Sequence, residues 1–284
     1  MKLNLLNLFV VLFTAFFLHS QAVAKDLVLG LIPAENNEEM IQNFEPMRQY
    51  LEKKIGARIR VFTATDYTSI IEGMKKKRVD IAWLGPFAYI LAEREANAEA
   101  FAVGVRADTG LSTYRSIFVV PEGSPAQTLA DLKGKRVAFV DPTSASGNLI
   151  PSYLVKKKTG AMPKVFFGRL IYAGSHDAAE MAVKNKTVDA AADNDITYDR
   201  MLKQGLITRQ SNRILLQSEP FPGAPLVYRS DLPENIKASI REAVLNAHVE
   251  MQQVTGYGEL MKYEAISPDD YHQIRDLIKE LNLL

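Results

Sequence analysis

The chain has 284 residues, 47% of them hydrophobic and 24% charged, which is typical of a globular protein with a sizeable core. Lys and Arg number 34 against 33 Asp and Glu. The formal net charge of +1 therefore gives no reason to expect nucleic acid or a membrane surface as the main partner. The absence of cysteine excludes disulfides and a thiol-linked lipid anchor, so we expect stability to come from the hydrophobic core.

Residues 1–24 have the pattern of a secretory signal peptide. Lys2 is the only formal charge before Lys25, an apolar run covers residues 8–18, and residues 22–24 read Ala-Val-Ala, a small-x-small cleavage site. An uncleaved membrane anchor is the alternative, but the apolar run is shorter than the roughly 18 to 20 residues that a spanning helix needs. We therefore predict export to the periplasm and a mature protein that begins near Lys25.

Strand and helix patterns alternate along the rest of the chain. A first set has strands over 27–32, 59–62, 79–83 and 101–105, with helices over 46–55, 66–76 and 87–95. A second set has strands over 114–120, 136–140, 165–172, 188–192, 213–217 and 226–229, with helices over 146–158, 176–184 and 198–203. Two helices, over 236–255 and 268–281, complete the chain. This alternation predicts parallel or mixed sheets covered by helices.

The two sets predict an α/β protein of two lobes, each a mixed sheet flanked by helices, with a hinged cleft between them. We expect the chain to cross between lobes near 110–114 and again near 215–222. The first lobe would then contain residues 25–112 and 220–284, and the second lobe residues 113–219. Ligands of such folds bind at the carboxyl ends of strands and the amino ends of helices, so the junctions between strands and helices are the candidate binding segments.

The segment from Asp141 to Gly147 reads Asp-Pro-Thr-Ser-Ala-Ser-Gly and joins an apolar strand to a helix. The first amides of a helix have no acceptor within the helix, and the helix dipole favours negative charge at that end. Ser144 and Ser146 add hydroxyl donors, and the amide of Ala145 can approach a ligand closely. The segment therefore predicts an anion site, and a capped helix after a flexible turn is the alternative.

Two tyrosines and one histidine also stand at or near the starts of predicted helices and strands. His176 lies in the first turn of a helix, where protonation is disfavoured and a neutral ring donor is plausible. Tyr67 begins the helix after another strand, and Tyr114 begins the strand after the first crossing, so both hydroxyls could reach the cleft. The alternatives are a surface histidine on a capped helix and tyrosines that pack on the sheets.

Trp83 and an Asp-x-Asp pair are weaker candidates. Trp83 ends a buried strand and is more typical of a core than of a ligand platform. Asp193 and Asp195 follow a predicted strand and could bind a metal, an amine or an acidic proton of a ligand. Solvated turn residues are the simpler interpretation of that pair.

These segments, in this order, resemble those of the phosphonate- and phosphite-binding proteins of ABC importers, the PhnD-type family. The resemblance runs from about Leu27 to beyond Tyr271. It rests on residues 65–67, 79–83 with Gly85, Tyr114, 141–147 with Pro151, 174–176 and 188–190. It implies a type II-like periplasmic binding fold and a small phosphorus oxyanion, such as methylphosphonate or phosphite, as ligand. The positions that it implies for binding are Tyr67, Tyr114, Ser144, the amide of Ala145, Ser146 and His176.

The resemblance also implies an ABC permease of the inner membrane as partner, no cofactor, and a monomer. The chain departs from the relatives that bind aminoalkylphosphonates, because Ile196 and Ala224 stand where those relatives have acidic residues for the amine. Ala145 stands where some relatives have threonine. These departures weaken the case for 2-aminoethylphosphonate, although Asp193 and Asp195 lie nearby in the sequence and could substitute.

An enzyme and a sensory module are the rival functions. A hydrolase would need a metal cluster or an activated nucleophile, but the histidines at 19, 176, 248 and 272 show no metal-binding spacing. A triad of Ser144, His176 and Asp195 can be drawn, yet no nucleophile-elbow pattern supports it. We therefore predict no catalytic residues and no metal site. A ligand sensor for a signalling partner stays open.

Overall fold

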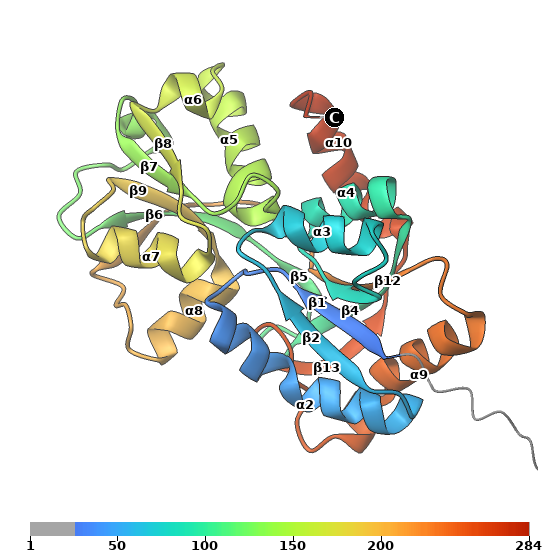
Figure 1. Cartoon of the computed structure of the whole chain (residues 1–284). Helices are drawn as coiled ribbons and strands as arrows, with labels where there is room; N and C mark the ends of the chain where they lie inside the picture. Colours follow the sequence, from blue (N-terminus) through green and yellow to red (C-terminus); the bar gives the residue numbers. More distant parts are fainter. Residues whose placement is uncertain (1–25, 284) are drawn as a thin grey trace, which may run out of the picture.

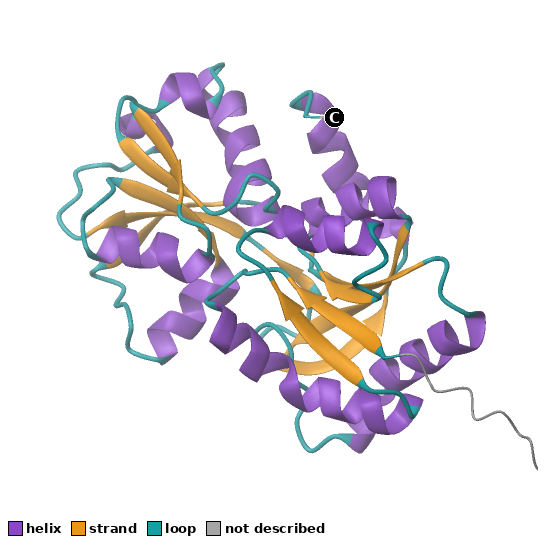
Figure 2. Cartoon of the chain, in the orientation of Figure 1, coloured by secondary structure: helices purple, strands orange, loops and turns teal. Residues whose placement is uncertain are grey.

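In a computed structural model that describes residues 26–283, the strands form two main sheets, each flanked by helices (Figure 2). The first sheet has the strand order β13-β4-β12-β3-β1-β2. Its strands are β1 (Leu27–Leu31), β2 (Ile59–Thr63), β3 (Ile81–Trp83), β4 (Ala98–Arg106), β12 (Pro225–Arg229) and β13 (Leu260–Ala265). The sheet is mixed, because β1 pairs in parallel with β2 and β3 while β12 and β13 run antiparallel to their neighbours.

The second sheet has the strand order β10-β6-β9-β7-β8 and is also mixed. Its strands are β6 (Ser116–Pro121), β7 (Arg136–Phe139), β8 (Arg169–Tyr172), β9 (Ala190–Asn194) and β10 (Asn212–Gln217). Successive side chains of a strand point to opposite faces, and β6 shows this clearly. Phe118 and Val120 belong to one apolar cluster, whereas Ile117 and Val119 belong to the other, so both faces of this sheet are buried.

Helices cover both sheets and make two lobes (Figure 1). The first lobe has α2 (Asn37–Ile55), α3 (Tyr67–Lys75), α4 (Pro86–Ala96), α9 (Glu234–Glu250), the short turn η3 (Pro268–Tyr271) and α10 (His272–Glu280). The second has η1 (Leu129–Leu132), η2 (Ala145–Leu149), α5 (Ile150–Thr159), α6 (Pro163–Phe166), α7 (His176–Lys184) and α8 (Asp195–Lys203). Within residues 26–283, no helix is both long and apolar enough to span a bilayer.

The chain passes between the sheets twice, and the two crossings pair with each other. β5 (Thr113–Tyr114) lies in the first crossing and β11 (Phe221–Pro222) in the second, and they form a two-stranded antiparallel ribbon. The rings of Tyr114 and Phe221 pack with centroids 4.4 Å apart. This ribbon joins the two lobes and is the hinge of the fold.

Several elements differ from the predictions, and the predicted signal peptide lies outside the described residues. The strand predicted over 165–172 begins only at Arg169, because Pro163–Phe166 form the short helix α6, which Pro163 begins. The helix predicted to begin at Pro46 begins at Asn37, because the side chain of Asn36 accepts a hydrogen bond from the Glu39 amide at 3.0 Å and caps it. Pro46 lies inside this helix on its exposed side, where its missing amide is tolerated. Strand β13 was not predicted, since Tyr263 is its only fully buried residue and the usual alternation is weak.

Candidate functional site

A cavity of about 50 Å³ lies between the two lobes, next to the hinge. A buried water needs roughly 10–15 Å³ of such space, so the cavity suits a ligand of only a few non-hydrogen atoms. Seven of the nine predicted site residues line it, namely Tyr67, Trp83, Tyr114, Ser144, Ala145, Ser146 and His176. All seven are buried, so their side chains lie mostly out of contact with bulk water.

The serine loop forms the donor wall of this cavity. The side chain of Ser144 caps the following helix by accepting a hydrogen bond from the Gly147 amide at 3.0 Å. The amides of Ala145 and Ser146 come before the first hydrogen bond within the helix, so they have no acceptor there. A Cβ atom on Gly147 would come within 2.4 Å of Val140, which explains why glycine holds the loop against the end of β7.

His176 enters the cavity from the first turn of α7, which Ser175 caps. Its backbone amide donates to the carbonyl of Ala34 in the other lobe at 2.8 Å. Its Nδ1 lies 2.5 Å from Oδ1 of Asp193, a fully buried residue of β9. Burial lowers the pKa of His176 to about 4, and neighbouring carboxylates only partly oppose this, so the ring is neutral at pH 7.

Tyr67 and Tyr114 bring hydroxyl groups from the first lobe and from the hinge. Tyr67 is the first residue of α3, which Asp66 caps by accepting from the Ser69 amide at 2.8 Å. The Tyr67 hydroxyl is buried and has no hydrogen-bond partner among the described residues, although it lines the cavity. Burial raises the pKa of both tyrosines, so both hydroxyls stay protonated and can donate.

Trp83 belongs to the core and to the site at once. Its ring packs against Phe44 with a centroid distance of 5.6 Å and against Tyr257 with a centroid distance of 4.8 Å. It also lines the cavity, together with apolar side chains of which Ile196 and Ala224 are two. The lining therefore combines the donor wall of the serine loop with a group of apolar side chains, Trp83, Ile196 and Ala224, which we call the apolar wall.

Asp193 and Asp195 do not line the cavity, since other groups occupy their carboxylates. Asp195 accepts from Nη1 of Arg106 at 2.7 Å and from the Arg115 amide at 2.9 Å. Asp193 lies behind His176 and contacts its ring. The lining residues therefore include no Asp or Glu. Among residues 26–283, no three His, Asp, Glu or Cys side chains are grouped so that they could hold a metal ion.

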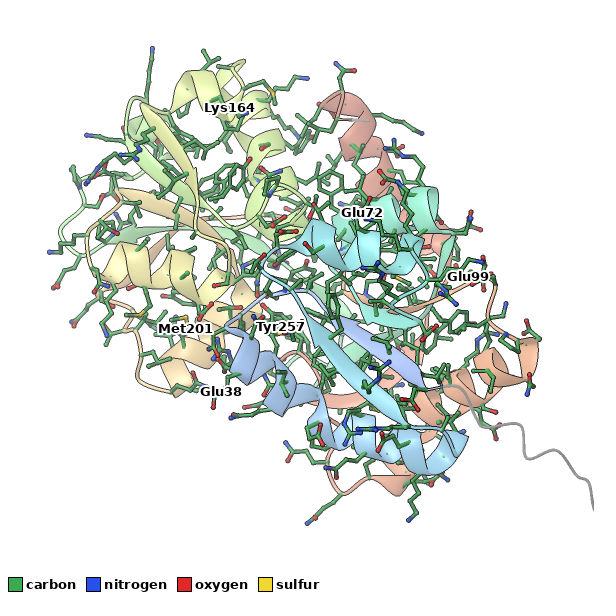
Figure 3. All side chains as sticks on the ribbon, viewed as in Figure 1. Glu38, Glu72, Glu99, Lys164, Met201 and Tyr257 are labelled. Carbon is green, nitrogen blue, oxygen red and sulfur yellow. The ribbon has the colours of Figure 1, made fainter. Side chains whose placement is uncertain are left out.

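The sequence did not reveal three of the polar lining residues: Arg106, Asn194 and Tyr257. Tyr257 lies near the centre of the molecule between the lobes (Figure 3). Its hydroxyl accepts from Nδ2 of Asn194 at 3.0 Å, across 63 positions of sequence. Arg106 ends β4, and its guanidinium is shared between Asp108 and Asp195. Only long-range pairing brings these residues to the site, so no local motif marks them.

Several hydrogen bonds join the lobes around the cavity. Oδ2 of Asp141 in the second lobe accepts from the Tyr67 amide of the first at 3.4 Å. Nε of Arg200 in α8 donates to Oε1 of Glu35 at 2.9 Å, and its Nη1 also pairs with Glu39. Figure 1 shows α8 beside the start of α2, where Glu39 lies. The structure is thus of a closed form, in which both lobes contact each other.

Two hinged α/β lobes around a small interlobe cavity define a solute-binding protein of the periplasmic type. The model of the family described as "ABC transporter, phosphonate, periplasmic substrate-binding protein" matches residues 29–271. The chain belongs to this family, which confirms the resemblance and the fold class predicted from the sequence.

Relatives of known name support this assignment. The phosphonates-binding periplasmic protein of Escherichia coli K12 is 34% identical over 232 residues, which cover 80% of this chain and 68% of that protein. The phosphate-import protein PhnD of Mycolicibacterium smegmatis is 28% identical over 249 residues, covering 84% of this chain and 78% of that protein. A binding protein of an ABC phosphonate transporter from Pseudomonas aeruginosa has a similar structure, with a TM-score of 0.80, 28% identity, and coverage of 89% of this chain and 85% of that one.

Proposed function

We propose that this protein is the periplasmic solute-binding component of an ABC importer, and that it captures a small phosphorus oxyanion in the cavity between its lobes. The observation that carries this proposal is the cavity itself, in which hydroxyls, helix amides and an imidazole converge without any carboxylate among the lining residues. The E. coli relative is named for phosphonates and the M. smegmatis relative for phosphate, so a tetrahedral phosphorus oxyanion is the common ligand class.

The donor wall supplies the binding groups. Ser144, Ser146 and the amides at the start of η2 would hold two oxygens of the anion, and His176 would contact a third. Tyr67 and Tyr114 would close over the ligand from the first lobe and the hinge. Hydrogen bonds from fixed amides and hydroxyls to an anion are strong, and they need no buried lysine. Trp83 would contribute to the apolar wall.

The apolar wall favours a ligand in which hydrogen or methyl replaces one oxygen. An oxygen of phosphate that faced Ile196 or Ala224 would lack a donor, and an unsatisfied buried polar group costs about 1–3 kcal/mol. The amine of 2-aminoethylphosphonate would likewise lack a carboxylate, because Asp193 and Asp195 are engaged elsewhere. The small volume also disfavours long substituents. Methylphosphonate and phosphite are therefore the proposed ligands.

Titration calorimetry with phosphate, phosphite, methylphosphonate, ethylphosphonate and 2-aminoethylphosphonate tests this ligand class. We expect phosphite or methylphosphonate to bind at least tenfold more tightly than phosphate and 2-aminoethylphosphonate, since about 1.4 kcal/mol corresponds to tenfold. Tightest binding of phosphate or of the amine would overturn the assignment of the apolar wall. The same samples should show no turnover of phosphate esters or phosphonates, because we propose a binding protein and not an enzyme.

The mature form is a further expectation. We propose that residues 1–24 are removed on export, that the protein begins near Lys25 in the periplasm, and that it is a monomer which presents both lobes to the permease. Intact-mass measurement of protein recovered from the periplasm should give the mass of a chain that begins near Lys25, and light scattering should give one copy. A full-length mass or a stable dimer would contradict this expectation.

A further inference from the structure

Two buried carboxyl groups lie behind His176. Glu180 follows His176 by one turn of α7, so both side chains lie on the same face of the helix. Asp193 reaches this face from β9, and Asn212 reaches it from β10. Glu180, Asp193 and Asn212 each have 0% of their surface exposed. The direct role proposed above for His176 does not use either carboxyl group.

The hydrogen bonds of this cluster leave one oxygen of each carboxyl group without a donor. Oδ1 of Asp193 lies 2.5 Å from Nδ1 of His176, and Oε2 of Glu180 accepts from Nδ2 of Asn212 at 2.5 Å. Oδ2 of Asp193 and Oε1 of Glu180 are buried and unpaired among the described residues. The side chains of Glu180 and Asp193 are nevertheless within hydrogen-bonding reach of each other.

One proton satisfies both unpaired oxygens. Two ionised carboxylates in contact, without water or a cation between them, would be strongly unfavourable, whereas a carboxylic acid can donate to a neighbouring carboxylate. Burial raises the pKa of both groups well above the usual range, which agrees with a shared proton at pH 7. Asp193 would then accept from Glu180 on one oxygen and from His176 on the other.

We propose that Glu180 and Asp193 share one proton and act as positioning residues for His176. They hold the imidazole proton on Nδ1, so that Nε2 faces the cavity as an acceptor. Every bound anion then carries one proton at its contact with Nε2. This inference rests on the proposed function. An anion oxygen and a bare Nε2 offer only lone pairs to each other, so their contact requires a hydrogen between them. A monoanion brings that proton on its own hydroxyl, whereas a dianion must take one up from solvent.

Other charged groups near the cluster do not provide this proton. Glu35, Asp177 and Asp141 also face His176, and in their ionised form they favour its protonation. Burial raises the pKa of Glu35 to about 7, so at the pH of about 9 used in the test below it is ionised and has no proton to give. Arg200 faces Asp193 and Glu35, but its guanidinium is engaged by Glu35 and Glu39. The surrounding carboxylates therefore favour a proton in the contact between Nε2 and the anion.

Proton uptake measured by calorimetry tests this inference. Methylphosphonate or phosphite would be titrated at about pH 9, where the free ligand is a dianion, in two buffers of different ionisation enthalpy. We expect about one proton taken up per ligand bound, and affinity that falls about tenfold for each pH unit above the second pKa of the ligand. Binding without proton uptake would overturn the inference but leave the proposed function standing. If no oxyanion in the panel binds, the proposed function itself fails.

Three variants separate positioning from structural support. Asp193→Asn can donate from its amide to Nδ1, which leaves the ring proton on Nε2, so proton uptake should fall towards zero. Glu180→Gln keeps a donor for Asp193 and should retain the uptake, whereas Glu180→Ala should weaken binding at least tenfold. Glu93→Gln, in an ion pair of α4 outside the cavity lining, is the matched control and should behave as wild type. Unchanged uptake in Asp193→Asn, or equal losses in Glu180→Gln and Glu180→Ala, would contradict the shared proton.

Discussion

His176→Ala is expected to weaken the binding of methylphosphonate or phosphite by at least tenfold. The ring lines the cavity and is held against Asp193, so its removal deletes a fixed contact to the anion and leaves Asp193 without its partner. Hydrogen bonds to charged groups contribute about 1.5–3 kcal/mol, which corresponds to roughly tenfold or more in affinity. Titration calorimetry against wild type provides the measurement.

His248→Ala is the matched control for this variant. His248 is exposed near the end of α9, so its removal should leave both affinity and stability unchanged. Ser144→Ala tests the donor wall and should also lose about tenfold in affinity, together with some stability from the lost helix cap. Unchanged binding in both His176→Ala and Ser144→Ala would place the ligand elsewhere.

The second large effect concerns closure of the lobes. Arg200→Ala should weaken ligand binding by about ten- to a hundredfold, because it leaves Glu35 buried in the closed form without its cation. Burial already raises the pKa of Glu35 to about 7 even with Arg200 beside it. A smaller population of the closed form lowers the apparent affinity in proportion, so both the dissociation constant and the dissociation rate should rise.

Lys203→Ala provides the comparison for Arg200→Ala. Lys203 also pairs across the lobes, with Glu259 at 2.9 Å, but both side chains are about three-fifths exposed (59% and 63%). Exposed ion pairs contribute little, so this variant should change affinity by less than about twofold. Similar losses in the two variants, or no loss in Arg200→Ala, would show that the buried ion pair does not control closure.

Much of the fold could be predicted because its signals are local. The alternation of buried strands with amphipathic helices follows from residues a few positions apart, and it predicted the two-lobed α/β class that the structure and the relatives confirm. The failures also have local causes. The first long helix starts at the Asn36 cap and not at Pro46, and β13 carries too little buried surface to show a strand pattern.

The candidate site likewise contains residues whose place could be predicted from the sequence and residues whose place could not. The serine loop and His176 follow the ends of strands and begin helices, so their place at the cavity could be predicted from position alone. The partner of Asp195 could not be predicted in this way, because Arg106 lies 89 residues away in the sequence and only the folded chain brings the two together. The same holds for the contact between Asn194 and Tyr257. Long-range pairing therefore decides which carboxylates face a ligand.

The pairing of the two hinge strands has a consequence for delivery. Tyr114 belongs to this ribbon and also lines the cavity, so a ligand bound as proposed would contact the segment that joins the two lobes. A ligand bound between the closed lobes would be released only as often as the lobes open, because hydrogen bonds join them around the cavity. A permease that separates the lobes through contacts with their outer surfaces would release the ligand without contacting it.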